Sequence, residues 1–130
     1  MKCRKSASRS RRNVRSRAPA RACVQLDHVS DLDLIERAFE VGCGAAMADG
    51  SKLALEDNVA LVAEAARIAR RFGGAVEAEL GHVSGEEDIA RAAAAGKLTA
   101  PDEVGPFIAR TGAACLAVSI GNVHGTYSSA

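Results

Sequence analysis

The sequence predicts an α/β fold that is built on a parallel sheet of four strands. From residue 23 onwards, short apolar runs alternate with longer amphipathic stretches, and glycines stand between many of them. A repeated strand–helix–strand order is typical of right-handed βαβ units, whose strands lie parallel in one sheet. Residues 1–22 do not share the pattern and have almost no apolar periodicity, so we expect them to be a disordered basic segment.

The alternation begins with a short buried strand, Cys23–Leu26. A helix is predicted over Ser30–Val41, because Ser30 and Asp33 match a capping box and the apolar side chains that follow fall on one face. Ala45–Ala48 is expected to be the second strand. These three elements form the first βαβ unit.

The rest of the chain repeats the same order. Apolar residues at helical spacing predict a long helix over Leu55–Phe72, and a third strand is expected over Ala75–Leu80. Ile89–Ala95 resembles a short helix, and Pro101 opens another that runs to Arg110. Cys115–Ile120 is predicted as a fourth strand, continuous and apolar as a parallel strand covered on both faces should be.

The length of the chain leaves two architectures open. Its 130 residues are 48% hydrophobic but only 3% aromatic, which predicts one modest domain with a core of Ala, Val, Leu and Ile. Four strands without a return fit either a small open α/β sheet or half of a (β/α)8 barrel, which typically needs about 250 residues. The pattern alone does not separate these two folds.

The net charge of +1 conceals two very different regions. Residues 1–22 hold nine Lys or Arg and no acid, whereas the remainder holds eight Lys or Arg against 16 Asp or Glu, a net charge of −8. The basic segment could bind nucleic acid, direct the chain to an organelle, or be an inert or non-native start. It holds no aromatic residue for base stacking, so we favour the last interpretation and expect no nucleic-acid partner.

Cysteines and hydropathy point to an intracellular, soluble protein. None of the four cysteines forms a CxxC pair, which argues against a structural zinc site of the finger type. Buried, reduced thiols in a cytoplasmic protein are the expected state. No apolar run approaches the roughly 20 residues that a membrane span requires.

Acidic and histidine residues follow directly on the predicted strands. His28 and His124 each come after a strand, and Asp27, Asp49, Glu77 and Glu79 are embedded in or next to apolar stretches. Parallel strands present their carboxyl ends at one edge of a sheet, where two imidazoles and a carboxylate would suit zinc. A cation explains several carboxylates at one sheet end more easily than burial of each alone. The remaining histidine, His82, lies in a polar stretch and is expected to be solvated.

Six short motifs in order resemble the class II, zinc-dependent fructose-bisphosphate or tagatose-bisphosphate aldolase family. The resemblance runs from about Cys23 to Tyr127. Any one of the motifs would be a weak signal, but six in register are a strong one. They are Leu-Asp-His at 26–28, Met-Ala-Asp-Gly-Ser at 47–51, Leu-Glu-Asp-Asn at 55–58, Glu-Ala-Glu-Leu-Gly at 77–81, Gly-Glu-Glu-Asp at 85–88 and Gly-Asn-Val-His-Gly-Thr-Tyr at 121–127.

The resemblance implies a partial (β/α)8 barrel over residues 23–130 and a role for each matching position. His28 and His124 would be ligands of a catalytic Zn²⁺, and Asp49 and Glu79 would hold a second or alternative metal position. Asp27 would be the acid or base at the hydroxyl of the bond being broken. Glu87 would move the proton on the dihydroxyacetone phosphate carbon, and Gly125 would touch that substrate through its backbone.

The implied activity is that of a lyase of carbohydrate metabolism and glycolysis. The reaction is reversible aldol cleavage of a ketose 1,6-bisphosphate to dihydroxyacetone phosphate and glyceraldehyde 3-phosphate. The family's third zinc histidine and its Gly-rich phosphate segment have no match here, so we expect little or no activity from this chain alone. A non-catalytic fragment that acts as a binding partner is the main alternative, and a basic-tailed nucleic-acid binder is the least favoured. A homo-oligomer is a further alternative, because the unpaired sheet edges of a half-barrel can pair with those of another copy.

Overall fold

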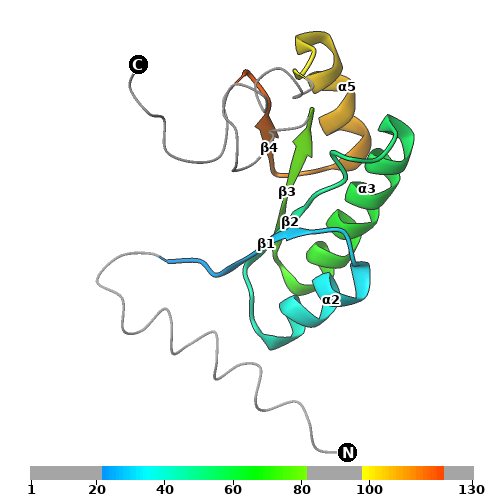
Figure 1. The fold of residues 1–130 in the computed structure, drawn as a ribbon. Coiled ribbons are helices and arrows are strands. Elements are labelled where there is room, and N and C mark those ends of the chain that lie inside the picture. The colour runs from blue at the N-terminus through cyan, green and yellow to red at the C-terminus, as the bar shows by residue number, and fades with distance from the viewer. Residues whose placement is uncertain (1–21, 82–97, 122–130) are drawn as a thin grey trace, which may run out of the picture.

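A computed structural model of the protein describes residues 22–81 and 98–121 (Figure 1). These residues form four strands and three helices that alternate along the chain. In order they are β1 (Gln25–Val29), α2 (Leu32–Val41), β2 (Ala45–Ala48), α3 (Leu55–Phe72), β3 (Ala75–Leu80), α5 (Pro101–Thr111) and β4 (Cys115–Val118). The predicted helix Ile89–Ala95 and residues 1–21 of the basic segment lie outside the described residues.

The four strands form one sheet in the order β1-β2-β3-β4, and every neighbouring pair is parallel. Figure 1 shows α2, α3 and α5 side by side along one face of this sheet. The predicted parallel α/β architecture is therefore confirmed. Among the described residues the sheet stays open, because β1 and β4 are its two edges.

The hydrophobic core lies between the sheet and the helices. Alternation along β3 turns Val76, Ala78 and Leu80 toward the helices, and all three are buried there. Phe39 of α2 and Phe72 of α3 stack at the other end of this layer, with ring centroids 6.0 Å apart. The opposite face of β3 carries Glu77 and Glu79, so these two carboxylates lie on the side of the sheet away from the helices.

A glycine at position 74 lets the chain enter β3 beneath the Phe39 ring. A Cβ at Gly74 would lie 2.4 Å from Phe39 Cε1 and 3.1 Å from the backbone oxygen of Gly44. The Phe39 ring cannot move away without disturbing its own packing, and the Gly44 backbone cannot move away without disturbing the start of β2. Gly74 is therefore required by close approach and not by backbone conformation.

Two predicted boundaries are wrong at the beginning of the fold. The first strand is Gln25–Val29 and not Cys23–Leu26, because the polar pair Asp27-His28 continues the strand instead of ending it. The helix that follows begins at Leu32 and is capped by Asp31, whose Oδ1 accepts hydrogen bonds from the backbone N–H groups of Asp33 and Leu34. The predicted capping box on Ser30 does not form.

The fourth strand and the cysteines also differ from expectation. β4 ends at Val118, and both Cys115 and Val118 are exposed, so this edge strand is not covered on both faces. Cys23 and Cys115 are exposed free thiols and Cys43 is partly buried, which contradicts the expected buried cysteines. In the described ranges, 22–81 and 98–121, no helix has the length and apolar character needed to cross a membrane.

Candidate metal centre

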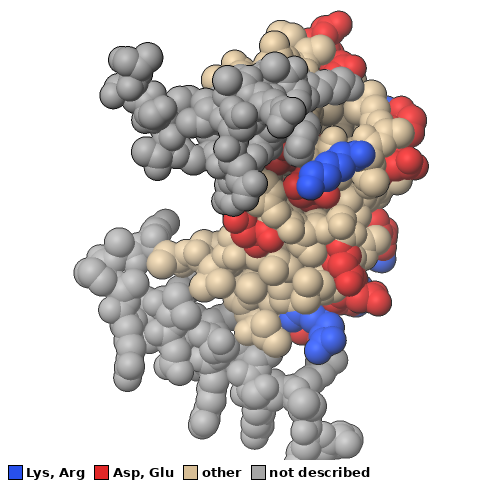
Figure 2. Space-filling view, viewed as in Figure 1, with Lys and Arg blue, Asp and Glu red and all other residues tan. Residues whose placement is uncertain are grey.

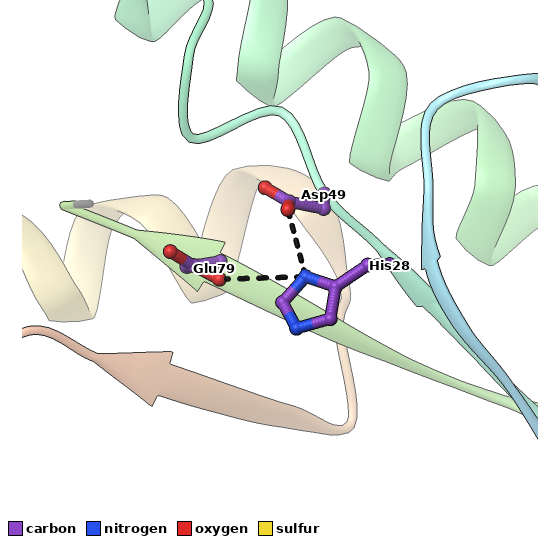
Figure 3. A group of neighbouring side chains, drawn as sticks. All are labelled: His28, Asp49 and Glu79. Carbon is purple, nitrogen blue, oxygen red and sulfur yellow. Dashed lines mark hydrogen bonds and ion pairs between the residues drawn. The ribbon is translucent and has the colours of Figure 1, made fainter. Parts of the chain in front are cut away.

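A break in the β1–β2 pairing turns His28 toward the ends of the neighbouring strands. The register shifts between Leu26 and Val29, and His28 has a φ of 40°, which is uncommon for a residue other than glycine. Such irregularities in a strand re-aim a side chain that strict alternation would place on the other face. In Figure 3 the His28 ring points toward Asp49 and Glu79.

Asp49, the residue directly after β2, is held by several hydrogen bonds. Its backbone N–H donates to the Val29 oxygen at 2.9 Å, which continues the contact between β1 and β2. The backbone N–H of Ser51 donates to Asp49 Oδ1 at 3.0 Å. The other carboxylate oxygen, Oδ2, lies 2.8 Å from His28 Nδ1. The carboxylate is thus oriented from both sides.

Glu79, on β3, supplies a second and more deeply buried carboxylate. Its Oε2 lies 3.9 Å from His28 Nδ1. The exposed fraction of the side chain is 41% for His28, 19% for Asp49 and 3% for Glu79. The three groups therefore form a gradient from solvent into the protein, and a buried carboxylate requires compensation by positive charge or hydrogen bonds.

The electrostatics of the cluster favour an ion pair when no metal is bound. The hydrogen bond to Asp49 raises the pKa of His28 above its ordinary value of 6.5; burial opposes this, and the charges of Asp49, Asp27 and Glu79 add to it. Burial alone would raise the pKa of Asp49, but hydrogen bonds from His28 and Ser51 outweigh it and hold that pKa below 3.8. Both pKa shifts therefore favour a protonated imidazole beside an ionised carboxylate.

The donor set fits a divalent metal ion. His28, Asp49 and Glu79 each offer one ligand atom, and these atoms lie within 4.8 Å of one another. Ligands that stand about 2.0–2.2 Å from a zinc ion lie within about 4.4 Å of each other. Both distances from His28 Nδ1, 2.8 Å and 3.9 Å, meet that limit. Binding would displace the proton shared by His28 and Asp49.

Other residues predicted for the site are placed as follows. Asp27 is exposed on β1 beside His28, and its negative charge is felt by the imidazole. Glu77 accepts a hydrogen bond from Gln25 Nε2 at 2.8 Å and stands opposite Cys115 in the sheet, so it is occupied away from the cluster. Burial raises the pKa of the Cys115 thiol, and the Glu77 charge adds to that. Three predicted site positions, Glu87, His124 and Gly125, lie outside the described residues, as do the acidic segment at 85–88 and His82, which is expected to be solvated.

Sequence reasoning assigned no role to Asn58, which the structure places directly behind the cluster. Asn58 is 2% exposed, and its Nδ2 donates to the backbone oxygen of Glu79 at 2.9 Å. A signal was present in the sequence. Asn58 falls on the apolar stripe of α3 that Val62, Ala65 and Ala69 continue, and a polar residue in such a stripe indicates a specific partner.

Comparison with known proteins identifies the family. The family model described as "Fructose-bisphosphate aldolase class-II" matches residues 4–130. The chain belongs to the class II fructose-bisphosphate aldolase family. The resemblance that the six sequence motifs indicated is thereby confirmed.

Curated relatives in this family include aldolases named for two different sugars. The chain is 42% identical over 106 residues to the D-tagatose-1,6-bisphosphate aldolase subunit GatY of Klebsiella oxytoca, and 37% identical over 106 residues to the fructose-bisphosphate aldolase of Giardia intestinalis. It is also 41% identical over 103 residues to the uncharacterised protein YdjI of Escherichia coli. These matches cover 79–81% of this chain but only 32–37% of the relatives, so the chain spans about a third of their length.

Solved aldolase structures share the fold. One is a Coccidioides immitis protein assigned as a fructose-1,6-bisphosphate aldolase, with a TM-score of 0.75 and 34% identity, matched over 92% of this chain and 42% of that one. The YdjI aldolase of E. coli gives a TM-score of 0.72 and 33% identity, over 86% of this chain and 39% of that one. The described sheet is therefore an arc of a (β/α)8 barrel, as predicted. Its helix-free face corresponds to the barrel interior.

Proposed function

We propose that this chain carries part of the active centre of a zinc-dependent aldolase. The reaction is the reversible aldol cleavage of a ketose 1,6-bisphosphate to dihydroxyacetone phosphate and glyceraldehyde 3-phosphate. The observation that carries the proposal is the convergence of His28, Asp49 and Glu79 from three consecutive strands. Active sites of (β/α)8 enzymes are assembled from the carboxyl ends of several strands in this way.

We assign the metal ligands as follows. His28 and His124 bind the catalytic Zn²⁺, and Asp49 and Glu79 provide a second or alternative metal position. Support comes from the distances of 2.8 Å and 3.9 Å that join the two carboxylates to His28 Nδ1. One imidazole with two carboxylates is a donor set that zinc and similar divalent ions accept.

The protein groups would share the proton transfers. When bound, the metal ion supplies Lewis-acid polarisation of the substrate ketone. Asp27, which is exposed beside His28, takes the proton from the hydroxyl at the bond that breaks. Glu87 then delivers a proton to the dihydroxyacetone phosphate carbon, and the backbone of Gly125 contacts that substrate. Two carboxylates suit two proton transfers of opposite direction.

The substrate that we propose is a small sugar phosphate. Relatives of this chain are named for fructose and for tagatose bisphosphate, and these two sugars differ only in the configuration at one carbon. Both should therefore be tested.

The test is a coupled assay of dihydroxyacetone phosphate released from each ketose bisphosphate by the purified chain. We expect that a chelator abolishes any cleavage and that added zinc restores it. Asp27→Asn should remove this activity while bound zinc stays at the wild-type amount. Asp102→Asn, an exposed carboxylate in the first turn of α5, is the matched control and should change neither quantity.

Two results would speak against the proposal. Cleavage that persists with a chelator, or full cleavage by Asp27→Asn, would contradict the assigned roles. A folded, zinc-loaded chain without any cleavage would instead favour the alternative, a non-catalytic fragment that acts as a binding partner.

A further inference from the structure

The side chain of Asn58 joins the two strand ends that carry the carboxylates of the candidate metal centre. Asn58 lies in the first turns of α3, where its neighbours on the same helix face are apolar. A buried amide is costly unless it is hydrogen-bonded. A side chain of this kind at an otherwise apolar position therefore needs a specific reason.

On one side, Asn58 holds the backbone of Glu79. Its Nδ2 donates to the Glu79 oxygen at 2.9 Å. The last pair in the β2–β3 register is Ala48 with Ala78, so Glu79 stands one residue beyond the end of that ladder. Asn58 thus hydrogen-bonds to β3 at Glu79, the first residue beyond its pairing with β2.

On the other side, Asn58 packs directly against Gly50, the residue after Asp49. A Cβ at Gly50 would lie 2.4 Å from Asn58 Oδ1, 2.8 Å from its Cγ and 3.0 Å from its Cα. Gly50 is not among the residues with positive φ, so contact alone requires glycine here. Asn58 Oδ1 is buried and has no hydrogen-bond partner within the described ranges, which leaves the Gly50 backbone as its neighbour.

The turn that Asn58 supports is the one that orients Asp49. The Ser51 N–H donates to Asp49 Oδ1, and the Leu53 N–H donates to the Gly50 oxygen at 2.9 Å. A displacement of Gly50 would move both ends of this turn. It would therefore move the Asp49 carboxylate relative to Glu79.

We propose that Asn58, seated on Gly50, is a positioning residue that fixes the separation of the Asp49 and Glu79 carboxylates and thereby tunes the affinity of the centre for a divalent cation. The part that concerns the cation rests on the function proposed above. Asn58 itself is not a ligand, because its Nδ2 is used by the Glu79 backbone and its Oδ1 faces Gly50. Positioning groups behind metal ligands typically change metal affinity by about 10–100-fold when they are removed.

The first readout needs no metal. Amide resonances and hydrogen exchange of Ser51 and Leu80 are measured by NMR in the chelator-treated wild type, Asn58→Leu and Val62→Ala. Ser51 reports the Asp49 turn, and Leu80 shares a peptide group with the Glu79 oxygen. Val62 is equally buried one turn further along α3, so its variant controls for a general loss of core packing.

The second readout is the dissociation constant for Zn²⁺ alone, measured by competition with a chromogenic chelator. We expect Asn58→Leu to shift both amide signals, to speed Ser51 exchange and to weaken zinc binding about tenfold. Val62→Ala should lower the melting temperature without these changes. Gly50→Ala, which keeps every hydrogen-bonding group, should reproduce the Asn58→Leu effects if that variant fails to fold.

The outcomes separate the two proposals. If Asn58→Leu and Gly50→Ala leave the Ser51 and Leu80 signals as in Val62→Ala, or leave zinc affinity unchanged, the positioning role is overturned. If the signals shift as expected but the wild type binds no zinc, the positioning of the carboxylates stands and the proposed metal function fails.

Discussion

His28 Nδ1 and Asp49 Oδ2 lie 2.8 Å apart, and this contact joins the end of β1 to the residue that follows β2. It depends on the irregular pairing at the end of β1 and on the Ser51 N–H that fixes the other carboxylate oxygen. The raised pKa of His28 and the lowered pKa of Asp49 favour an ion pair between them, and the same two atoms would be ligands of the proposed metal ion. The protonation of His28 would therefore link stability to metal binding.

The first prediction concerns pH and the metal-free protein. His28 has a raised pKa, so its contribution to stability is complete below pH 6.5 and is lost as pH rises through the folded-state value. Asp49 has a lowered pKa, so its contribution is present above pH 3.8 and is lost as pH falls through the folded-state value. The pair therefore stabilises the metal-free fold most between these limits.

This window is checked by urea unfolding of the wild type and His28→Ala in the presence of a chelator. The difference in unfolding free energy should be larger at pH 5.5 than at pH 9. It should be modest at both, because the His28 side chain is 41% exposed and solvent screens the pair. An equal difference at the two pH values would show that the pair does not titrate in this way.

A second prediction concerns the N-terminus of α2. Asp31→Ala should lower the unfolding free energy by about 1 kcal/mol, because it leaves the N–H groups of Asp33 and Leu34 without their acceptor. Ser30→Ala is the matched control, since Ser30 is the neighbouring residue but not the cap. Thermal unfolding of both variants provides the measurement. A larger loss in Ser30→Ala than in Asp31→Ala would restore the capping box that the sequence suggested.

A third prediction concerns the junction between β3 and β4. The Thr99 hydroxyl donates to the Leu80 backbone oxygen and accepts a hydrogen bond from the Ser119 N–H. The backbone N–H of Thr99 in turn donates to the Ser119 oxygen. Thr99→Val keeps the shape but removes both hydroxyl bonds, and should cost about 1–3 kcal/mol. Thr99→Ser retains the hydroxyl and should cost less. Equal losses in the two variants would assign the effect to packing instead.

The order of elements could be predicted from the sequence because each depends on local periodicity. The bounds of β2, α3 and β3 match the prediction residue for residue, since apolar runs and glycines delimit them. The predicted first strand stops at Leu26, before the end of β1 at Val29, because Asp27 and His28 are polar. Their place in the sheet depends on pairing with β2, which a single segment does not encode.

The candidate site was predicted in part for the same reason. His28, Asp49 and Glu79 could be proposed as neighbours because parallel strands end at one edge, and the structure brings these three together. Asn58 could not be assigned from strand ends, because its partners come from a helix, a turn and a strand that meet only in the folded chain. The exposed β4 likewise reflects its position at the sheet edge, which its apolar sequence does not reveal.

Among the charged side chains on the face of the described residues that Figure 2 shows, acidic ones predominate, so nonspecific cation binding has to be separated from binding at the cluster. Asp102→Asn removes one acid from the exposed start of α5 and serves as the control for net charge. Glu79→Gln removes one charge from the buried end of the cluster with almost no change in volume. Each variant loses one negative charge, so the two have the same net charge and differ in the position of the lost carboxylate.

The most direct test is isothermal titration of Zn²⁺ into the chelator-treated wild type, Glu79→Gln and Asp102→Asn at pH 7.5. We predict one saturable site in the wild type and in Asp102→Asn, with affinity at least tenfold weaker in Glu79→Gln. Zinc binding that is equally tight in Glu79→Gln and in the wild type would contradict the metal centre at His28, Asp49 and Glu79.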